Sequence, residues 1–570
     1  MRSLTGVPIS PGYAEGIAVI LDLAQTSDIP QYSIDFNEVD REIARFHDAL
    51  ERSCDELGQL EQRVLDELGH TQSSIFSAHL ALLRDRQFSD KVKQRISDDL
   101  VNVEQALDGE ISDLARLLAS VENEYMRERA LDLRDVGKRV LRQLAHEDSP
   151  RLAALPSGSV IVARELLPSE AIDLDRRHLA GIVTEAGGVN SHAAILARAL
   201  GIPAVTAVTD ACTLIESGSR LLVDGVAGQV TLMPSTGALK DFSGRKQRYE
   251  RHAATEASAE QLDCVTLDGT PIKLLANINR QDEAALVARH YLHGVGLFRT
   301  ECLYLDAPTP PESDRQLEVY RQLVAALEGR SLVIRTLDLG GDKLPAFISR
   351  RRESNPNLGL RGLRFSLAEP ELFSAQLQAI ARVAGSGDVS VLFPMVLGPS
   401  DLRQGIELLR RESEAAGLDR LPPVGAMIET PSALFALPEI LALVDFISIG
   451  TNDLTQLMLA ADRNATELLE TSSVLHPSVL RAIRQVVRAC DEADREICVC
   501  GEAAGEAAIA SLLVGLGVRR LSMSPVRSAS VRYRLRRHRL SDLEDLAERS
   551  LAADSAEQVA QLLDALRPGA

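Results

Sequence analysis

The chain has 570 residues, of which 45% are hydrophobic and 25% charged, and its formal net charge is −20. This length exceeds what one hydrophobic core organises and predicts roughly three to four domains. The composition excludes a disordered or membrane protein, and the acidic balance argues against nucleic acid or an anionic membrane as the main partner.

The sequence contains no segment that resembles a signal peptide or a membrane anchor. The first residues lack an apolar core of signal-peptide length, and no later stretch reaches about 18 uncharged apolar residues. We therefore expect a cytoplasmic protein without membrane insertion. The seven cysteines follow no metal-ligand spacing, so any functional cysteine is expected to act as a thiol.

The first part of the chain predicts a small α/β domain with a helical insertion. Residues 1–30 and 147–230 form the expected α/β domain, with short strands in 1–22 and further strands at Ser159–Ala163, Gly181–Thr184 and Leu221–Val223. Residues 31–146 carry four stripes of apolar residues at helical spacing, which predict an up-down four-helix bundle. The stripes begin at Ile43, Ile75, Val103 and Tyr125. Residues 231–262 are polar and helix-prone, as expected of a linker.

Residues 263–570 contain eight short apolar runs separated by helix-like segments. Eight strand–helix units over about 300 residues predict a (β/α)₈ TIM barrel. The fold class is therefore multidomain α/β, with this barrel at its C-terminal end. The expected strands are Ile272–Ile278, Val295–Phe298, Leu332–Ile334, Ser390–Phe393, Val424–Ile428, Phe446–Ile449, Ile497–Val499 and Arg520–Ser522.

Polar side chains follow these strands at the points where the strands end. The loops after barrel strands form the active-site mouth of this fold, so the placement indicates a catalytic site. Glu429 and Asp453 end two successive strands and supply the oxygen ligands that Mg²⁺ prefers. Guanidinium groups suited to phosphate or carboxylate accompany them, and a lysine adds a point charge on a glycine-rich loop. These cations are Arg299, Arg335, Arg361, Arg463 and Lys343.

Cys500 ends the seventh expected strand in the sequence Cys-Gly-Glu. No neighbour suggests nucleophilic acyl chemistry, but the thiol is well placed to donate a proton. A buried structural cysteine is the alternative interpretation.

A second reactive position lies in the α/β domain, where residues 187–192 read GGVNSH. The glycines permit a tight turn, Asn190 or Ser191 can cap a helix, and Gly201 ends it. His192 is thus expected in the first helical turn, where the helix dipole favours an anion and disfavours the imidazolium ion. A neutral imidazole there can attack phosphorus, although a merely packed histidine is the alternative.

The GGVNSH segment and the barrel motifs together resemble enzyme I of the bacterial phosphoenolpyruvate-dependent sugar phosphotransferase system. The resemblance is collinear over essentially the whole chain. The barrel motifs are GVGLFRTE at 294–301, RTLDLGGDK at 335–343, NPNLGLR at 355–361, FISIGTNDLTQ at 446–456 and CGE at 500–502. Asn190 stands where this family commonly has threonine, and Leu360 where tryptophan is common.

The resemblance implies that phosphoenolpyruvate phosphorylates His192 through Nε2, that this group passes to the phosphocarrier protein HPr, and that pyruvate is released. It also implies that the helical insertion binds HPr and that the barrel forms a homodimer. Mg²⁺ would be held by Glu429 and Asp453, and Cys500 would protonate the enolpyruvate carbon. The substrate would be bound by Arg299, Arg335, Asn452, Asp453 and Arg463.

Three other functions were weighed against this one. An ATP-dependent dikinase or synthase needs a nucleotide-binding module before the small domain, but no P-loop is present. A regulatory protein without catalysis is disfavoured by the presence of Glu429, Asp453, Cys500 and His192. A nitrogen-branch regulatory paralogue usually carries a further N-terminal sensory domain, whereas this sequence begins with its first strand.

Overall fold

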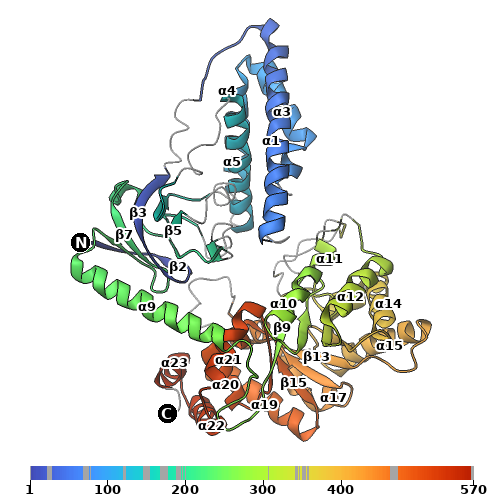
Figure 1. The fold of residues 1–570 in the computed structure, drawn as a ribbon. Helices are drawn as coiled ribbons and strands as arrows, with labels where there is room; N and C mark the ends of the chain where they lie inside the picture. Colours follow the sequence, from blue (N-terminus) through green and yellow to red (C-terminus); the bar gives the residue numbers. More distant parts are fainter. Residues whose placement is uncertain are drawn as a thin grey trace. The chain divides into compact units, whose positions relative to one another are not determined.

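The protein comprises two compact units, residues Met1–Arg251 and His252–Ala570, in a computed structural model. Figure 1 draws the chain coloured from its N-terminus to its C-terminus. The structure describes residues 2–21, 29–68, 76, 79–119, 124–145, 155–166, 178–187, 194, 197–198, 200–305, 307, 309–340, 345, 347–348, 355, 358–461 and 473–566.

The first unit contains an eight-stranded mixed sheet with the order β1-β8-β7-β3-β4-β5-β6-β2. The central strands β3 to β6 run parallel to one another, and β1, β2, β7 and β8 pair antiparallel with their neighbours. The strands are β1 (Arg2–Thr5), β2 (Val7–Ser10), β3 (Tyr13–Leu21), β4 (Ser159–Ala163), β5 (Leu179–Thr184), β6 (Ala204–Thr206), β7 (Arg220–Asp224) and β8 (Gln229–Leu232).

Both faces of this sheet are covered, because alternate residues of the central strands enter two different cores. Ile161 and Ala163 of β4 pack in one core, while Val160 and Val162 pack in the other. The α/β character was predicted, whereas β6 and β8 were not, because each is only three or four residues long. The short helix α8 spans Ala211–Leu214.

The described part of residues 31–146 is mostly helical, as predicted. Helix α4 packs along α5, and α1 contacts α3, α4 and α5, so the apolar stripes meet in one core that contains Phe46, Leu57 and Leu107 (Figure 1). The helices are α1 (Val39–Leu68), α3 (Arg86–Asp99), α4 (Val103–Ala119) and α5 (Glu124–Ala145). Helix α3 was not expected. Of the predicted stripe that begins at Ile75, only Ile75 lies outside the described residues; Phe76, His79, Leu80 and Leu83 are helical and buried, and the three apolar ones join the same core.

The second unit is the predicted barrel, closed in the order β9 to β16 with β16 pairing β9. All its neighbouring strands are parallel, and helices surround them (Figure 1). The strands are β9 (Lys273–Ile278), β10 (Gly294–Phe298), β11 (Ser331–Arg335), β12 (Val389–Phe393), β13 (Val424–Ile428), β14 (Phe446–Ile449), β15 (Glu496–Val499) and β16 (Arg520–Met523). Each matches an expected strand to within two residues.

The helices of the barrel unit cover the outer face of its strands and share one large core with them. They are α10 (Ala285–Arg289), α11 (Cys302–Leu305), α12 (Ser313–Leu327), α13 (Leu363–Ala368), α14 (Pro370–Ala384), α15 (Pro399–Ala415), α16 (Pro431–Phe435), α17 (Leu437–Leu441), α18 (Thr451–Leu459), α19 (Pro477–Glu492), α20 (Ala507–Gly515), α21 (Ser528–Leu535), α22 (Leu540–Leu551) and α23 (Ala556–Ala565). Within the described ranges, no helix is both long and apolar enough to cross a membrane.

Helix α9 (Thr236–Ser258) occupies most of the predicted linker and runs across the boundary between the two units. Its first half is attached to the sheet, because Arg245 forms an ion pair of 2.6 Å with the buried Asp224. The ring of Phe242 also packs edge-to-face on Tyr13. The finer division of the chain into the ranges 1–30 with 147–230, 31–146, 231–262 and 263–570 stays a prediction.

Two phenylalanines of the barrel unit offer a matched test of its core. Phe393 on β12 is fully buried and packs on Phe373, whereas Phe435 on α16 is 88% exposed. Phe393→Ala should destabilise the unit by about 3–5 kcal/mol, because it leaves a cavity. Phe435→Ala should leave stability nearly unchanged. Calorimetric melting of the full chain measures both, and equal shifts of the barrel transition would contradict this packing.

Candidate active site at the C-terminal rim of the barrel

Strand alternation brings the predicted side chains to the inside of one rim. Leu297, Val333 and Met427 form an inner layer within the barrel. Because side chains two apart on a strand share a face, the residues two positions further on point to the same side. Those residues include Arg299, Arg335 and Glu429, each at the carboxyl end of its strand or one residue beyond it. The rim is therefore lined with charge, while the layer beneath it is apolar.

An alternating network of charges links residues that follow three of the strands, β10, β11 and β14. Arg335 donates to Glu301 at 2.8 Å and forms an ion pair of 3.2 Å with Asp338. Arg361 donates to Asp338 through Nε and Nη2, both at 3.1 Å. The same guanidinium donates to both carboxylate oxygens of Asp453, at 2.8 and 3.0 Å. The order Glu301, Arg335, Asp338, Arg361, Asp453 thus alternates in sign at every step.

Glu429 lies deepest among the acidic groups, with 1% of its surface exposed. Its Oε1 accepts a hydrogen bond of 2.6 Å from the amide of Met395. Burial raises the pKa of Glu429 to about 8, and the carboxylates of Asp453 and Asp338 act in the same direction. Gly450 leaves room for this carboxylate, since a Cβ there would stand 2.4 Å from Oε2.

Cys500 lies inside the barrel with Leu297, Val333 and Met427, and it is 2% exposed. Its carbonyl accepts a hydrogen bond of 2.8 Å from Asn277, whose side chain in turn accepts one from Ser522 at 2.6 Å. Three strand ends thereby fix the backbone that carries the thiol. Burial raises the pKa of Cys500, so the sulfur holds its proton at neutral pH.

The rim retains donor capacity for an anion. The Nε of Arg335 is buried and has no hydrogen-bond partner within the part of the chain that the structure describes. A buried unpaired donor is costly, and a bound phosphate or carboxylate would satisfy it. Arg299 is half-buried at the end of β10. Asn452, on the first turn of α18, accepts a hydrogen bond of 3.2 Å from the amide of Glu502.

The sequence interpretation left two acidic residues of this network without a role. Glu301 and Asp338 belong to the motifs GVGLFRTE and RTLDLGGDK, but no function was assigned to them. Glu301 also accepts a hydrogen bond of 2.9 Å from the backbone amide of Asp338. It therefore binds Arg335 directly and also fixes the backbone of Asp338, the second acidic partner of Arg335. The signal was an acidic residue directly beside each arginine motif, in FRTE and RTLD. Three predicted site residues, His192, Lys343 and Arg463, lie outside the described residues.

Glu429 and Asp453 have the chemistry of a magnesium site. Asp453 follows β14, the strand that pairs with the β13 strand of Glu429, and its negative charge contributes to the raised pKa of Glu429. Mg²⁺ typically uses one or two protein carboxylates and completes its shell with substrate oxygens and water. Among the described residues, no group of three or more His, Cys, Asp or Glu side chains forms a complete metal cage. The donor set therefore fits an ion that is shared with a substrate.

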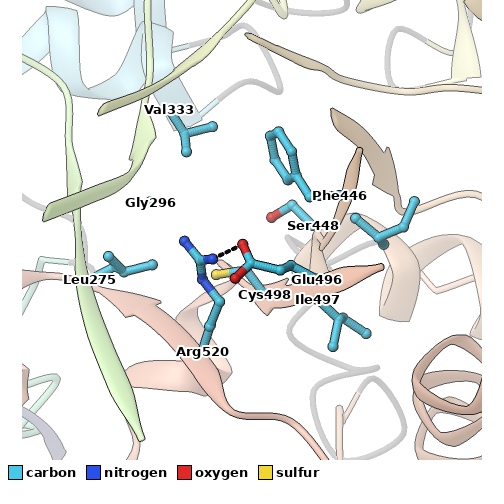
Figure 2. Close-up of a pocket in the computed structure, with 10 residues that line it drawn as sticks. Leu275, Gly296, Val333, Phe446, Ser448, Glu496, Ile497, Cys498 and Arg520 are labelled. Carbon is cyan, nitrogen blue, oxygen red and sulfur yellow. Dashed lines mark hydrogen bonds and ion pairs between the residues drawn. The ribbon is translucent and has the colours of Figure 1, made fainter. Parts of the chain in front are cut away.

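A small hollow lies at the opposite end of the barrel (Figure 2). It lies between the N-terminal halves of the strands, where Arg520 forms an ion pair with Glu496 beside Cys498. The space of about 20 Å³ admits about one water molecule. It is too small for a substrate, so the described chemistry of the barrel gathers at the C-terminal rim.

Comparisons with known proteins agree with this arrangement. Three sequence profiles match the chain: PEP-utilising enzyme, N-terminal, over residues 5–129; its mobile domain over 155–228; and its PEP-binding domain over 253–540. A Haloferax volcanii protein is 37% identical over 573 residues, covering 99% of both chains. A Bacillus subtilis protein is 35% identical over 565 residues, covering 98% of both. Each of these relatives is named phosphoenolpyruvate-protein phosphotransferase.

The contact between Gly450 and Glu429 gives a direct test of the rim geometry. Gly450→Ala should displace the Glu429 carboxylate and weaken Mn²⁺ binding about tenfold or more, as expected when a ligand is held out of place. Gly398→Ala is the matched control, because its nearest neighbour would be 3.9 Å away and its backbone is extended. Titration of Mn²⁺ by electron paramagnetic resonance measures both affinities. Equal affinities would show that Glu429 does not hold the cation.

Proposed function

This chain belongs to the family of PEP-utilising enzymes, and from that membership we propose that it is a phosphoenolpyruvate-protein phosphotransferase. The observation that carries the proposal is the rim of the barrel. Three guanidinium groups and a pair of close carboxylates meet there beside a protonated thiol. This combination suits a small substrate that carries a phosphate and a carboxylate and needs a proton when it leaves.

The phosphoryl acceptor is His192. Its place in the GGVNSH segment, at the expected start of a helix, supports this role, because a neutral imidazole is favoured there. The bond from phosphorus to the enol oxygen breaks as a bond from phosphorus to Nε2 forms. Acceptor and donor residues belong to different compact units, so the units have to meet for this step.

The substrate is bound by Arg299, Arg335, Asn452 and Arg463, together with Arg361 and Lys343. Guanidinium groups bind phosphate and carboxylate oxygens in a two-point manner, which fixes the substrate for in-line transfer. Glu429 and Asp453 would hold Mg²⁺. When bound, that ion would offset negative charge on the phosphoryl oxygens and on the enol oxygen. The buried carboxylates supply a site with little competing water.

Cys500 completes the reaction by donating its proton to the methylene carbon of the enolate, which yields pyruvate. The raised pKa of the buried thiol supports this role, because the donor must be protonated before transfer. The resulting thiolate is reprotonated from water after pyruvate leaves.

The phosphoryl group then passes from His192 to a histidine of the carrier protein HPr, which begins sugar uptake by the phosphotransferase system. The helical residues 31–146 are the proposed docking site for this carrier, and the barrel is the proposed homodimer interface. We place the enzyme in the cytoplasm, in agreement with the absence of a spanning helix among its described helices.

Radiolabelled phosphoenolpyruvate tests the acceptor. The wild-type chain should gain one labelled, acid-labile phosphoryl group per subunit, and His192→Ala should gain none, because no other imidazole has this position. His47→Ala is the control, since His47 is exposed on α1 and should label fully. Equal labelling of wild type and His192→Ala would refute the proposal.

Two neighbouring thiols test the proton donor. Cys500→Ala should slow pyruvate release by about a hundredfold or more, the usual contribution of a general acid, and leave binding of phosphoenolpyruvate nearly unchanged. Cys498→Ala is the matched control, because that buried thiol lies beside the small hollow at the other end of the barrel. Pyruvate is measured by a coupled reduction. Comparable losses in the two variants would argue against Cys500 as the donor.

A further inference from the structure

Arg361 and Asp453 make a contact that the proposed function does not explain. Both oxygens of this carboxylate accept hydrogen bonds from the two terminal nitrogens of Arg361, at 2.8 and 3.0 Å. The pair is well shielded, since about a tenth of each side chain is exposed. A carboxylate proposed as a metal ligand is therefore already neutralised by a cation of the chain itself.

A divalent cation and Arg361 compete for this carboxylate. The guanidinium group covers the open edge of Asp453, and a second positive charge on the same oxygens would be repelled strongly in this shielded rim. Coordination of a cation by Asp453 therefore requires Arg361 to withdraw. The withdrawal frees Nη1, because among the described residues that nitrogen bonds to Asp453 and to no other group.

Asp338 keeps Arg361 in place when this happens. It accepts from Nε and Nη2 of Arg361, both at 3.1 Å; Nη2 is shared with Asp453, whereas Nε bonds to Asp338. The same carboxylate, with 4% of its side chain exposed, pairs with Arg335 at 3.2 Å. One acidic group thus holds two guanidinium groups side by side, and its amide is fixed by Glu301.

We propose that Arg361 is a built-in counter-ion of Asp453 that a divalent cation displaces, and that Asp338 is a positioning residue that retains the displaced guanidinium beside Arg335 to bind the phosphate of the substrate. This inference rests on the proposed function for the identity of the substrate. Its first part concerns the metal and Asp453 and stands without it.

The exchange makes the binding of the cation and the binding of the substrate cooperative. Without the cation, Arg361 is engaged by two carboxylates and offers little to a phosphate group. With the cation bound, the freed donors of Arg361 are available next to those of Arg335. By linkage, the substrate must raise the affinity for the cation by the same factor as the cation raises that for the substrate.

The first experiment measures Mn²⁺ affinity of the full chain without substrate, by the electron paramagnetic resonance signal of the free ion. Arg361→Gln should bind Mn²⁺ about tenfold more tightly than wild type, because the competing cation is gone, a factor within the usual range for one close ion pair. Arg335→Gln is the matched control, since it removes the same charge from the same network but has no contact with Asp453. It should tighten binding clearly less.

Two outcomes would overturn the displacement. Unchanged or weaker Mn²⁺ binding by Arg361→Gln would show that the guanidinium does not compete. Equal tightening in Arg335→Gln would show that net charge alone sets the affinity. If Arg361→Gln lacks a cooperative thermal transition, Arg361→Lys replaces it. The lysine keeps the charge but loses the two-point grip on Asp453, so Mn²⁺ should still bind more tightly than in wild type, and the same two results would refute the idea.

The second experiment tests Asp338 in the His192→Ala background, where phosphoryl transfer is blocked. Mn²⁺ should strengthen binding of phosphoenolpyruvate in the parent, and Asp338→Asn should reduce this coupling at least about fivefold, within the usual range of coupling energies. Glu301→Gln is the control for lost negative charge, and its coupling should fall less. Coupling that survives in Asp338→Asn would remove its positioning role.

The two proposals fail in different ways. If the chain does not use phosphoenolpyruvate, labelling and the second experiment both fail, while the Mn²⁺ affinities without substrate still report on Arg361. If labelling succeeds and the Mn²⁺ affinities do not change as stated, the function stands and the exchange is wrong.

Discussion

The closed ring of parallel strands is the constraint on which this site depends. Closure brings the carboxyl ends of eight strands to one rim, and alternation points every second side chain inward. Charged groups at this depth lose most of their hydration, so each must find an opposite charge or a hydrogen bond. The alternating series from Glu301 to Asp453 meets that requirement with contacts of 2.8 to 3.2 Å. Glu429, which has an amide partner but shares its space with two other carboxylates, instead has a raised pKa.

Much of the fold could be predicted from periodicity, because most barrel strands are almost wholly buried and most helices bury one apolar face. All eight barrel strands are short apolar runs between helices, and all eight are present. The sheet of the first unit was predicted incompletely, since β6 and β8 are too short to establish an alternating pattern. Helix α3 was missed for another reason. Its buried residues are few, Phe88, Val92 and Ile96, and they stand among charged neighbours that read as a polar break.

The candidate site could be located from the sequence, but the pattern of ion pairs within it could not. Strand ends in a barrel converge whatever the sequence between them, so Arg299, Arg335, Glu429 and Cys500 could be grouped before any coordinates. The partner of each charged side chain depends on the paths of the loops, and the periodicity of the sequence does not predict these paths. Arg361 stands on the long connection after β11, and its contacts with Asp338 and Asp453 bridge 23 and 92 positions of the chain. Asp338 therefore looked like an ordinary strand-end residue until its two guanidinium partners were seen.

Stability alone does not account for this rim. Buried ion pairs seldom improve on apolar packing of the same volume, because desolvation offsets their attraction. The layer just beneath, with Leu297, Val333 and Met427, shows that the barrel interior can be filled by apolar side chains. A rim of leucines would hold the strands at least as well. The charges are better explained by the ligands that they accept. Arg335 offers a buried donor without a partner among the described residues, and the carboxylate of Asp453 has a partner that can be exchanged. Both features lower the free-energy cost of binding a ligand, and neither lowers the free energy of the empty fold.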